Sequence, residues 1–160
     1  MGWTHDQAVG IVANLQRESN LNPRAVGDNG AAYGAAQWHK DRQENFKAWA
    51  GKDIRESSLM EQLQFVNYEL TQGAERRAGA LLRAAQNAQQ AGEIVSRYYE
   101  RPAQAEAEAA RRGQASVALS NDVKIYVNGS SDPVATGREV AGQQERVNDD
   151  LVRSMQGAYS

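Results

Sequence analysis

The sequence predicts a mainly α-helical fold with a small β or irregular region and a C-terminal strand and helix appendage. Two segments join a helix-capping box to an apolar stripe, a glycine-rich run lies between them, and residues 123–128 alternate between apolar and polar side chains. With 160 residues, the chain is long enough for one domain with a sizeable core. We place the main domain at residues 1–119 and a strand–helix extension at residues 120–160.

The composition excludes several classes of function. Apolar residues make up 41% of the chain and charged residues 24%, as in ordinary globular proteins. The net charge of −2 provides no positive field, so we expect no nucleic-acid partner. The absence of cysteine excludes thiol chemistry, and two distant histidines without an H-E-x-x-H motif predict no metal and no cofactor. No stretch is apolar enough to insert into a membrane, and the start lacks the pattern of a signal peptide.

The first segment predicts a helix over residues 4–19. Thr4 and Gln7 have the spacing of a capping box, and Asn22-Pro23 disfavours continuation of the helix beyond residue 19. The apolar stripe of this helix, at i, i+3, i+4 and i+7, consists of Ala8, Ile11, Val12 and Leu15.

The run G-D-N-G-A-A-Y-G at residues 27–34 predicts a short hairpin or an irregular loop. Further helices are expected over residues 41–50, 58–72, 74–90, 91–100 and 103–119. Gly51 should end the first of these, with Phe46 and Trp49 pointing inward, and Ser58 and Glu61 should form a capping box at the start of the second.

The extension predicts a strand over residues 123–128 and a last helix that begins at Asp132-Pro133. Because a lone strand is not stable by itself, it must pair with the main domain or with another chain. The last helix has a narrow apolar seam, which leaves the same two possibilities open.

Glu18 is the strongest candidate for chemistry. It follows Ile11 by seven residues and Leu15 by three, so it prolongs the apolar stripe instead of facing water. It also lies at the C-terminus of the helix, where the macrodipole disfavours a carboxylate. Desolvation and the dipole both favour the protonated form, which a glycosidase needs to protonate a leaving oxygen. The same pattern also fits a glutamate at a frayed helix end.

The residues after Glu18 resemble a known enzyme family. The segment 18–25 begins with E-S and continues through N-P-x-A, and G-D-N-G is followed by Y-G-A-A-Q-W at residues 33–38. This combination resembles the superfamily of soluble lytic transglycosylases and goose-type lysozymes, and most closely the phage tail lysozyme domain. The resemblance runs from Trp3 to about Pro102. It implies a lysozyme-like fold and cleavage of peptidoglycan between N-acetylmuramic acid and N-acetylglucosamine.

By this resemblance, Glu18 matches the general acid and Asp28 matches an aspartate that positions the attacking water. In an inverting mechanism such a base lies roughly 6.5–9.5 Å from the acid. Aspartate in a G-D-N-G turn also serves simply to cap the turn. His39 stands where the goose-type pattern has a second aspartate, so it either replaces that residue as a base or sugar contact or has no role. Asp41 is a further candidate for this position.

The residues expected to contact the glycan are Tyr33, Gln37, His39, Tyr98 and Tyr99. Gln37 falls at the G-L-x-Q element of the family, and its amide both donates and accepts hydrogen bonds. The segment Y-Y-E-R-P at residues 98–102 resembles the end of the family pattern, where tyrosine offers a flat face and a hydroxyl to sugar. The alternative is that Tyr98 is a core residue and Tyr99 a surface residue. For Glu100 we expect a structural ion pair with Arg101.

The resemblance leaves the product of cleavage open. Attack by water gives a hydrolase, whereas attack by the muramic acid 6-hydroxyl gives a lytic transglycosylase with a 1,6-anhydro product. The Asp28 match favours hydrolysis, and a non-catalytic structural tail module is a further alternative. We expect the chain to be a virion protein of a phage tail that acts on peptidoglycan glycan strands in the host periplasm and cell wall. Residues 120–160 are then available for self-association or for contacts with tail proteins.

Overall fold

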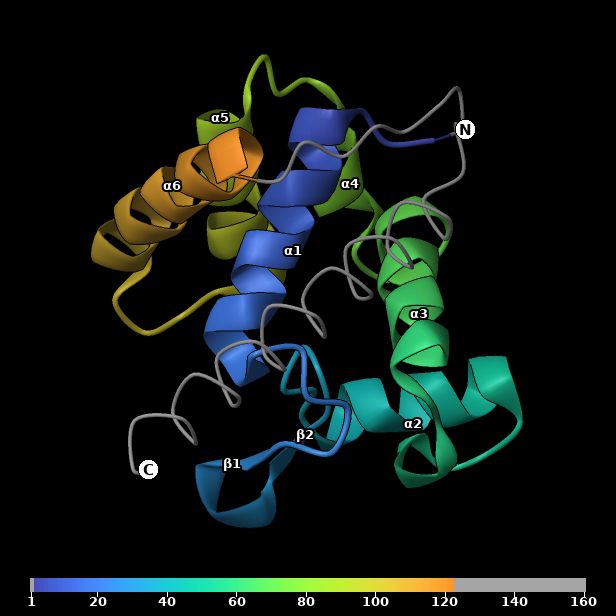
Figure 1. The fold of residues 1–160 in the computed structure, drawn as a ribbon. Helices are drawn as coiled ribbons and strands as arrows, with labels where there is room; N and C mark the ends of the chain where they lie inside the picture. The colour runs from blue at the N-terminus through green and yellow to red at the C-terminus, as the bar shows by residue number, and fades with distance from the viewer. Residues whose placement is uncertain (1, 123–160) are drawn as a thin grey trace, which may run out of the picture.

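The computed structural model describes residues 2–122, which form six α-helices and a two-stranded sheet (Figure 1). The predicted mainly α-helical class is confirmed. Helix α6 (Ala105–Asp122) runs past the predicted boundary at residue 119. The strand predicted over residues 123–128 and the helix after Asp132-Pro133 lie outside the described residues. Across residues 2–122, no helix is long and apolar enough to cross a membrane.

Helix α1 (His5–Ser19) is the central helix of the fold. Its capping box is the predicted one: the Gln7 N–H donates to Thr4 Oγ1, and the Thr4 N–H donates to Gln7 Oε1. Every residue from Gln7 to Leu15 is buried, because α1 packs against both α5 and α6. Gly10 allows the close approach to α5, since a Cβ at this position would lie 2.6 Å from the Cβ of Ala91.

A small hairpin follows α1 and confirms the turn chemistry seen in the sequence. It consists of β1 (Val26–Gly27), the 3-10 turn η1 (Asp28–Gly30) and β2 (Ala32–Tyr33). The strands are antiparallel, with Val26 opposite Tyr33. Asp28 and Asn29 have φ values of 46° and 54°, a left-handed conformation that Asp and Asn tolerate better than most residues.

Two helices beyond the hairpin pack together through aromatic rings. The elements are α2 (Lys40–Ala50), the 3-10 turn η2 (Ile54–Glu56) and α3 (Leu59–Thr71). Phe46 is fully buried, and its ring centroid lies 5.1 Å from that of Phe65. Trp49 was expected to point inward, but it is 36% exposed because it lies at the edge of this cluster, stacked on Tyr68 at 5.8 Å.

The helix predicted over residues 74–90 is wrong: the segment forms two helices, α4 (Arg76–Arg83) and the start of α5 (Ala88–Ile94). The side chain of Asn87 accepts from the Gln90 N–H and caps α5, so a new helix begins there and the predicted single helix is interrupted. Helix α5 continues directly into a π-helix, η3 (Val95–Glu100).

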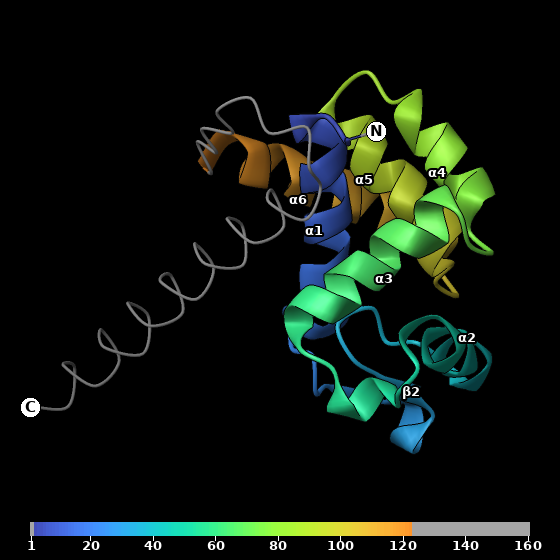
Figure 2. The same cartoon turned by 90° about the vertical axis from the view of Figure 1, so that its right-hand side faces the viewer.

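The hairpin and α2 lie beyond the C-terminal end of α1, whereas α4, α5 and α6 lie around its length (Figures 1 and 2). Helix α3 joins the two groups and contacts α4. One continuous core runs through both groups, and it includes Leu15 of α1, Phe65 of α3 and Tyr99 of η3. Glu18 therefore lies in the last turn of α1, where the two groups meet.

Candidate active site

The C-terminal end of α1 is tied to the loop that follows the hairpin. Asn20 and Leu21 have positive φ values of 55° and 58°, which end the helix and redirect the chain. The hydroxyl of Ser19 donates to the carbonyl oxygen of Ala35 at 2.8 Å. These contacts hold the backbone around Glu18 from the helix side and from the hairpin side.

The carboxylate of Glu18 is paired with Arg112 of α6. Its Oε1 lies 2.5 Å from Nη1 of Arg112, and the two side chains are 20% and 6% exposed, so the pair is shielded from bulk water. Arg112 also donates to Oδ1 of Asn14 at 3.2 Å, and its Nε lies 3.4 Å from Glu108. The acid therefore has a defined orientation. The guanidinium places a positive charge against the carboxylate, a contact that the sequence did not predict.

Glu100, at the end of η3, is a second carboxyl in the electrostatic reach of Glu18. Its Oε1 is enclosed, and within residues 2–122 it has no hydrogen-bond partner. Burial raises the pKa of Glu100 to about 8, and the negative charge of Glu18 acts in the same direction. The positive charges of Arg42 and Arg112 act in the opposite direction and reduce the rise of this pKa.

The expected ion pair between Glu100 and Arg101 is wrong. Arg101 has a left-handed φ of 54°, which ends the π-helix and turns the chain. Its guanidinium instead binds Glu75, at the start of α4, through two hydrogen bonds of 2.7 and 2.8 Å. Arg101 is engaged in that bidentate pair. Among residues 2–122, no basic side chain is in direct contact with the carboxyl of Glu100.

A second buried charge centre is formed by Glu69 of α3, which is 2% exposed. Its two oxygens each accept from Arg42 at 2.8 Å. Oε2 also accepts from the indole N–H of Trp38 at 2.9 Å and from the hydroxyl of Tyr99 at 2.6 Å. The guanidinium of Arg42 lies over the ring of Tyr99, 4.4 Å from its centroid. This network joins α2, α3 and η3.

The two tyrosines of the Y-Y-E-R-P segment have different environments. Tyr99 is fully buried and its hydroxyl donates to Glu69, so its side chain presents no surface to a glycan. Tyr98 is 44% exposed and remains the tyrosine of this segment that can reach a substrate. The alternative considered from the sequence, a core Tyr98 and a surface Tyr99, is wrong, because Tyr99 lies on the same buried face as Val95 and Ser96.

Asp28 and His39 are in contact on the hairpin side. Nε2 of His39 lies 3.0 Å from Oδ2 of Asp28, and the two side chains are 59% and 66% exposed. Asp28 is in η1, and His39 is the residue before α2. The structure therefore brings Asp28 together with His39, which stands at the position of the second aspartate, and leaves both side chains open to solvent. Asp41, in the first turn of α2, is exposed as well.

Gln37 and Tyr33 hold the hairpin in place. The side-chain nitrogen of Gln37 donates to the carbonyl oxygens of Ala25 at 3.3 Å and Gly34 at 2.9 Å. Tyr33 is 8% exposed, and the guanidinium of Arg55 lies 4.7 Å from the centroid of its ring. The side-chain nitrogen of Gln37 is thus engaged with backbone, so this amide has a structural role in the loop after the hairpin.

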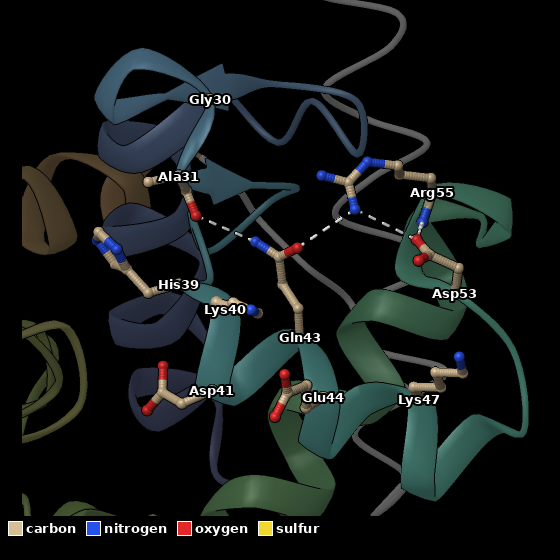
Figure 3. Close-up of a pocket in the computed structure, with 10 residues that line it drawn as sticks. All are labelled: Gly30, Ala31, His39, Lys40, Asp41, Gln43, Glu44, Lys47, Asp53 and Arg55. Atoms are coloured by element: carbon tan, nitrogen blue, oxygen red, sulfur yellow. Dashed lines mark hydrogen bonds and ion pairs between the residues drawn. The ribbon is translucent and has the colours of Figure 1, made fainter.

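A pocket of about 930 Å³ opens beside His39, between the hairpin, α2 and η2 (Figure 3). His39 lies at one side of it and Arg55 at the other, and Gln43 connects Ala31 to Arg55 through hydrogen bonds of 3.2 and 3.3 Å. The charged residues of the lining have both signs and include Lys40, Lys47, Asp41, Glu44 and Asp53. Such a lining suits a hydrated, polar ligand. In the described region, no three His, Asp or Glu side chains are grouped so that they could hold a metal ion.

Comparison with known families identifies the chain. The family model for phage tail lysozyme matches residues 1–121. The chain belongs to the phage tail lysozyme family. It is a lysozyme-like enzyme that degrades peptidoglycan and a component of a phage tail. A search of curated proteins found no match.

Two buried charged residues of the site, Arg112 and Glu69, were not predicted from the sequence. Arg112 lies on a stripe of small buried residues, Ala109, Gly113 and Ser116, which indicates the face of α6 that meets α5. Glu69 follows Val66 by three residues and therefore extends the buried face of α3. Both charged residues could have been found from these positions, because a charge on a packed helix face needs a partner.

Proposed function

We propose that the chain is a muramidase that hydrolyses the β-1,4 bond between N-acetylmuramic acid and N-acetylglucosamine. Glu18 is the general acid and Asp28 positions the attacking water. The observation that carries this proposal is the shielded carboxyl of Glu18, held by Arg112 at the end of α1 and adjoining the hairpin that bears Asp28. In the virion, this activity would open the host cell wall locally during phage entry.

In the proposed reaction, the glycosidic oxygen takes the proton of Glu18 as its bond to the anomeric carbon breaks, and water attacks that carbon. Asp28 accepts the proton of the water. The guanidinium of Arg112 stabilises the carboxylate that remains on Glu18 after proton transfer. His39 orients Asp28 through their 3.0 Å contact.

Both sides of the site offer further contacts for the glycan. His39 on the hairpin side and Tyr98 of η3 are exposed, and the oxygen of the Gln37 amide can accept from a sugar hydroxyl. The pocket beside His39 provides a polar surface for the sugars or stem peptides that flank the reacting bond (Figure 3). These contacts are proposals that rest on exposure and position.

A lytic transglycosylase is the second candidate. The observation in its favour is that His39, rather than a second carboxylate, accompanies Asp28. In that reaction the muramic acid 6-hydroxyl replaces water as the nucleophile, and Asp28 has no water to position.

Mass spectrometry of digested peptidoglycan distinguishes the two reactions. We expect hydrolysed, reducing muramic acid ends, and exclusively 1,6-anhydro ends would overturn the hydrolase assignment.

In a turbidity assay on purified cell walls, Glu18→Gln should reduce the rate by about 10²–10⁴-fold, because the general acid is lost. Glu106→Gln, on the 82% exposed Glu106 of α6, is the matched control. Equal clearing by Glu18→Gln and the wild type would show that the acid is misassigned.

A further inference from the structure

The pocket beside His39 is lined by charged side chains that take no part in the proposed reaction. Its lining combines three basic and three acidic residues: Lys40, Lys47, Arg55, Asp41, Glu44 and Asp53. The lining residues include no Trp, Tyr or Phe on which a sugar ring could stack. An uncharged sugar offers no partner for these charges, whereas a ligand with charges of both signs does. The chemistry of the lining therefore favours a short, charged ligand over a further sugar.

Most of these charges are not engaged with the protein itself. Four exposed side chains of α2 form no hydrogen bond and no ion pair within the described range 2–122: Lys40, Asp41, Glu44 and Lys47. Lys40 and Glu44 have the i, i+4 spacing at which opposite charges can pair on a helix, yet no ion pair joins them. Two ammonium groups and two carboxylates on one wall of the pocket are thus available to a ligand (Figure 3).

The opposite wall of the pocket is held in place by Arg55 of η2. Its Nη1 donates to Oε1 of Gln43 at 3.3 Å and lies 3.4 Å from Oδ1 of Asp53, while its guanidinium covers the ring of Tyr33. The amide nitrogen of Gln43 donates in turn to the carbonyl oxygen of Ala31 at 3.2 Å. These contacts join the hairpin, α2 and η2, so the pocket is formed before a ligand enters (Figure 3). A preformed site loses less entropy on binding than one that must first be ordered.

The pocket adjoins the residues that face the reacting sugar in the proposed reaction. His39 lines the pocket, and its Nε2 lies 3.0 Å from Oδ2 of Asp28, which positions water at the anomeric carbon of N-acetylmuramic acid. The stem peptide of peptidoglycan is attached to this same sugar through its lactyl group. The peptide carries carboxylates and, on its diamino acid, an amino group. The volume of about 930 Å³ is near the upper end of the range for ligand sites, which suits a peptide of a few residues.

We propose that this pocket binds the stem peptide of the N-acetylmuramic acid unit that is cleaved. Lys40 and Lys47 contact the carboxylates of the peptide, and Asp41 and Glu44 contact its amino group. The inference rests on the proposed function, because the role of Asp28 places the reacting sugar beside His39. Binding of this kind stabilises the bound substrate and the transition state alike, so it lowers KM and leaves kcat nearly unchanged.

A comparison of two substrates tests the proposal. Uncrosslinked glycan strands that carry stem peptides are compared with the same strands after an amidase has removed the peptides. The wild type should show a kcat/KM about 3–10-fold higher on the peptide-bearing strands, the size expected for a few exposed ion pairs. The double variant Lys40→Ala/Lys47→Ala should lose most of this preference through KM. Equal kcat/KM of the wild type on both substrates would overturn the pocket assignment and leave the role of Glu18 intact.

The matched control removes the same charge from another place. Arg76→Ala/Arg77→Ala, at two exposed positions of α4, also takes away two positive charges and should keep the preference of the wild type. An equal loss of preference in this control would overturn the pocket assignment, because net charge alone would then explain the result.

A binding measurement that does not use activity separates this inference from the proposed function. The probe is an N-acetylmuramyl tripeptide ending in diaminopimelate, added to the full ¹⁵N-labelled chain and followed by NMR. It should shift the backbone amides of α2 and η2, and Lys40→Ala/Lys47→Ala should weaken its binding by about 3–10-fold. N-acetylmuramic acid without the peptide is the control and should bind more weakly. Absence of shifts in α2 and η2 would overturn the pocket assignment. Binding of the probe there by a protein that does not cleave either strand would support the pocket while overturning the muramidase assignment.

Discussion

The two sides of the candidate active site are built differently. On the helical side, Glu18 is held by an arginine that is 6% exposed and reaches it from a helix far along the chain. On the hairpin side, Asp28 lies in a 3-10 turn between strands of two residues, and its partner His39 is 59% exposed. Both carboxylates contact a nitrogen-bearing side chain, but only the contact of Glu18 is shielded from water.

The difference in exposure predicts different contributions of the two contacts to the stability of the fold. A buried ion pair is costly to break, because the remaining charge is left without a partner or water. An exposed pair contributes little, since solvent screens it and replaces the lost contact. We therefore expect the loss of a shielded ion pair to lower the free energy of unfolding, and the loss of the exposed contact between Asp28 and His39 to leave it nearly unchanged.

The largest expected effect on the free energy of unfolding is that of Glu69→Ala. The substitution leaves the guanidinium of Arg42 buried without its bidentate partner, and should lower the free energy of unfolding by about 3–5 kcal/mol. Urea denaturation followed by circular dichroism measures this change. Glu44→Ala, at an exposed position of α2, should stay within about 0.5 kcal/mol of the wild type. Similar midpoints for the two variants would contradict the structural role of Glu69.

The next expected effect is a pH dependence of the free energy of unfolding that arises from Glu100. The pKa of Glu100 rises from 4.5 to about 8 on folding, so between these values the folded state holds a proton that the unfolded state has released. This contribution to stability is complete below pH 4.5 and is lost as pH rises toward 8. The wild type should lose on the order of 1 kcal/mol per pH unit relative to Glu100→Gln in this window. Parallel stability curves for the two proteins would show that Glu100 ionises as freely in the fold as in the unfolded chain.

A smaller effect on the free energy of unfolding is expected for Gln37→Ala, in the loop after the hairpin. The variant loses two hydrogen bonds to backbone carbonyls at a half-buried position, and the free energy of unfolding should fall by about 1–2 kcal/mol. Thermal unfolding of Gln37→Ala and Gln43→Ala would compare two amides that hold the same loop. No loss of stability in Gln37→Ala would leave substrate contact as the remaining role of this amide.

The smallest effect on stability, and a large one on rate, is expected for Asp28→Asn. The exposed pair with His39 should contribute less than about 1 kcal/mol to the free energy of unfolding. If Asp28 positions the water, wall clearing should fall by about 10²–10⁴-fold with binding to cell walls preserved. A normal rate in Asp28→Asn would show that Asp28 only shapes the turn. The two sides of the site would then differ in exposure, with no catalytic role for the hairpin aspartate.

The sequence by itself determined the features that depend on neighbours along the chain. The capping boxes at Thr4 and Ser58, the left-handed end of α2 at Gly51 and the glycine-rich hairpin all follow from hydrogen bonds within a few residues. The stripe that ends at Glu18, together with the motifs after it, was enough to predict the family.

Only the tertiary structure decided which charges meet. The partner of Glu18 is 94 residues away, Arg101 binds Glu75 instead of its neighbour, and Tyr99 is buried while Tyr98 is exposed. Local spacing cannot predict such contacts, because they depend on how α6 and η3 pack against α1. The hydrogen bonds of caps and turns form within one segment, whereas the ion pair of a buried charge forms only when distant segments pack together.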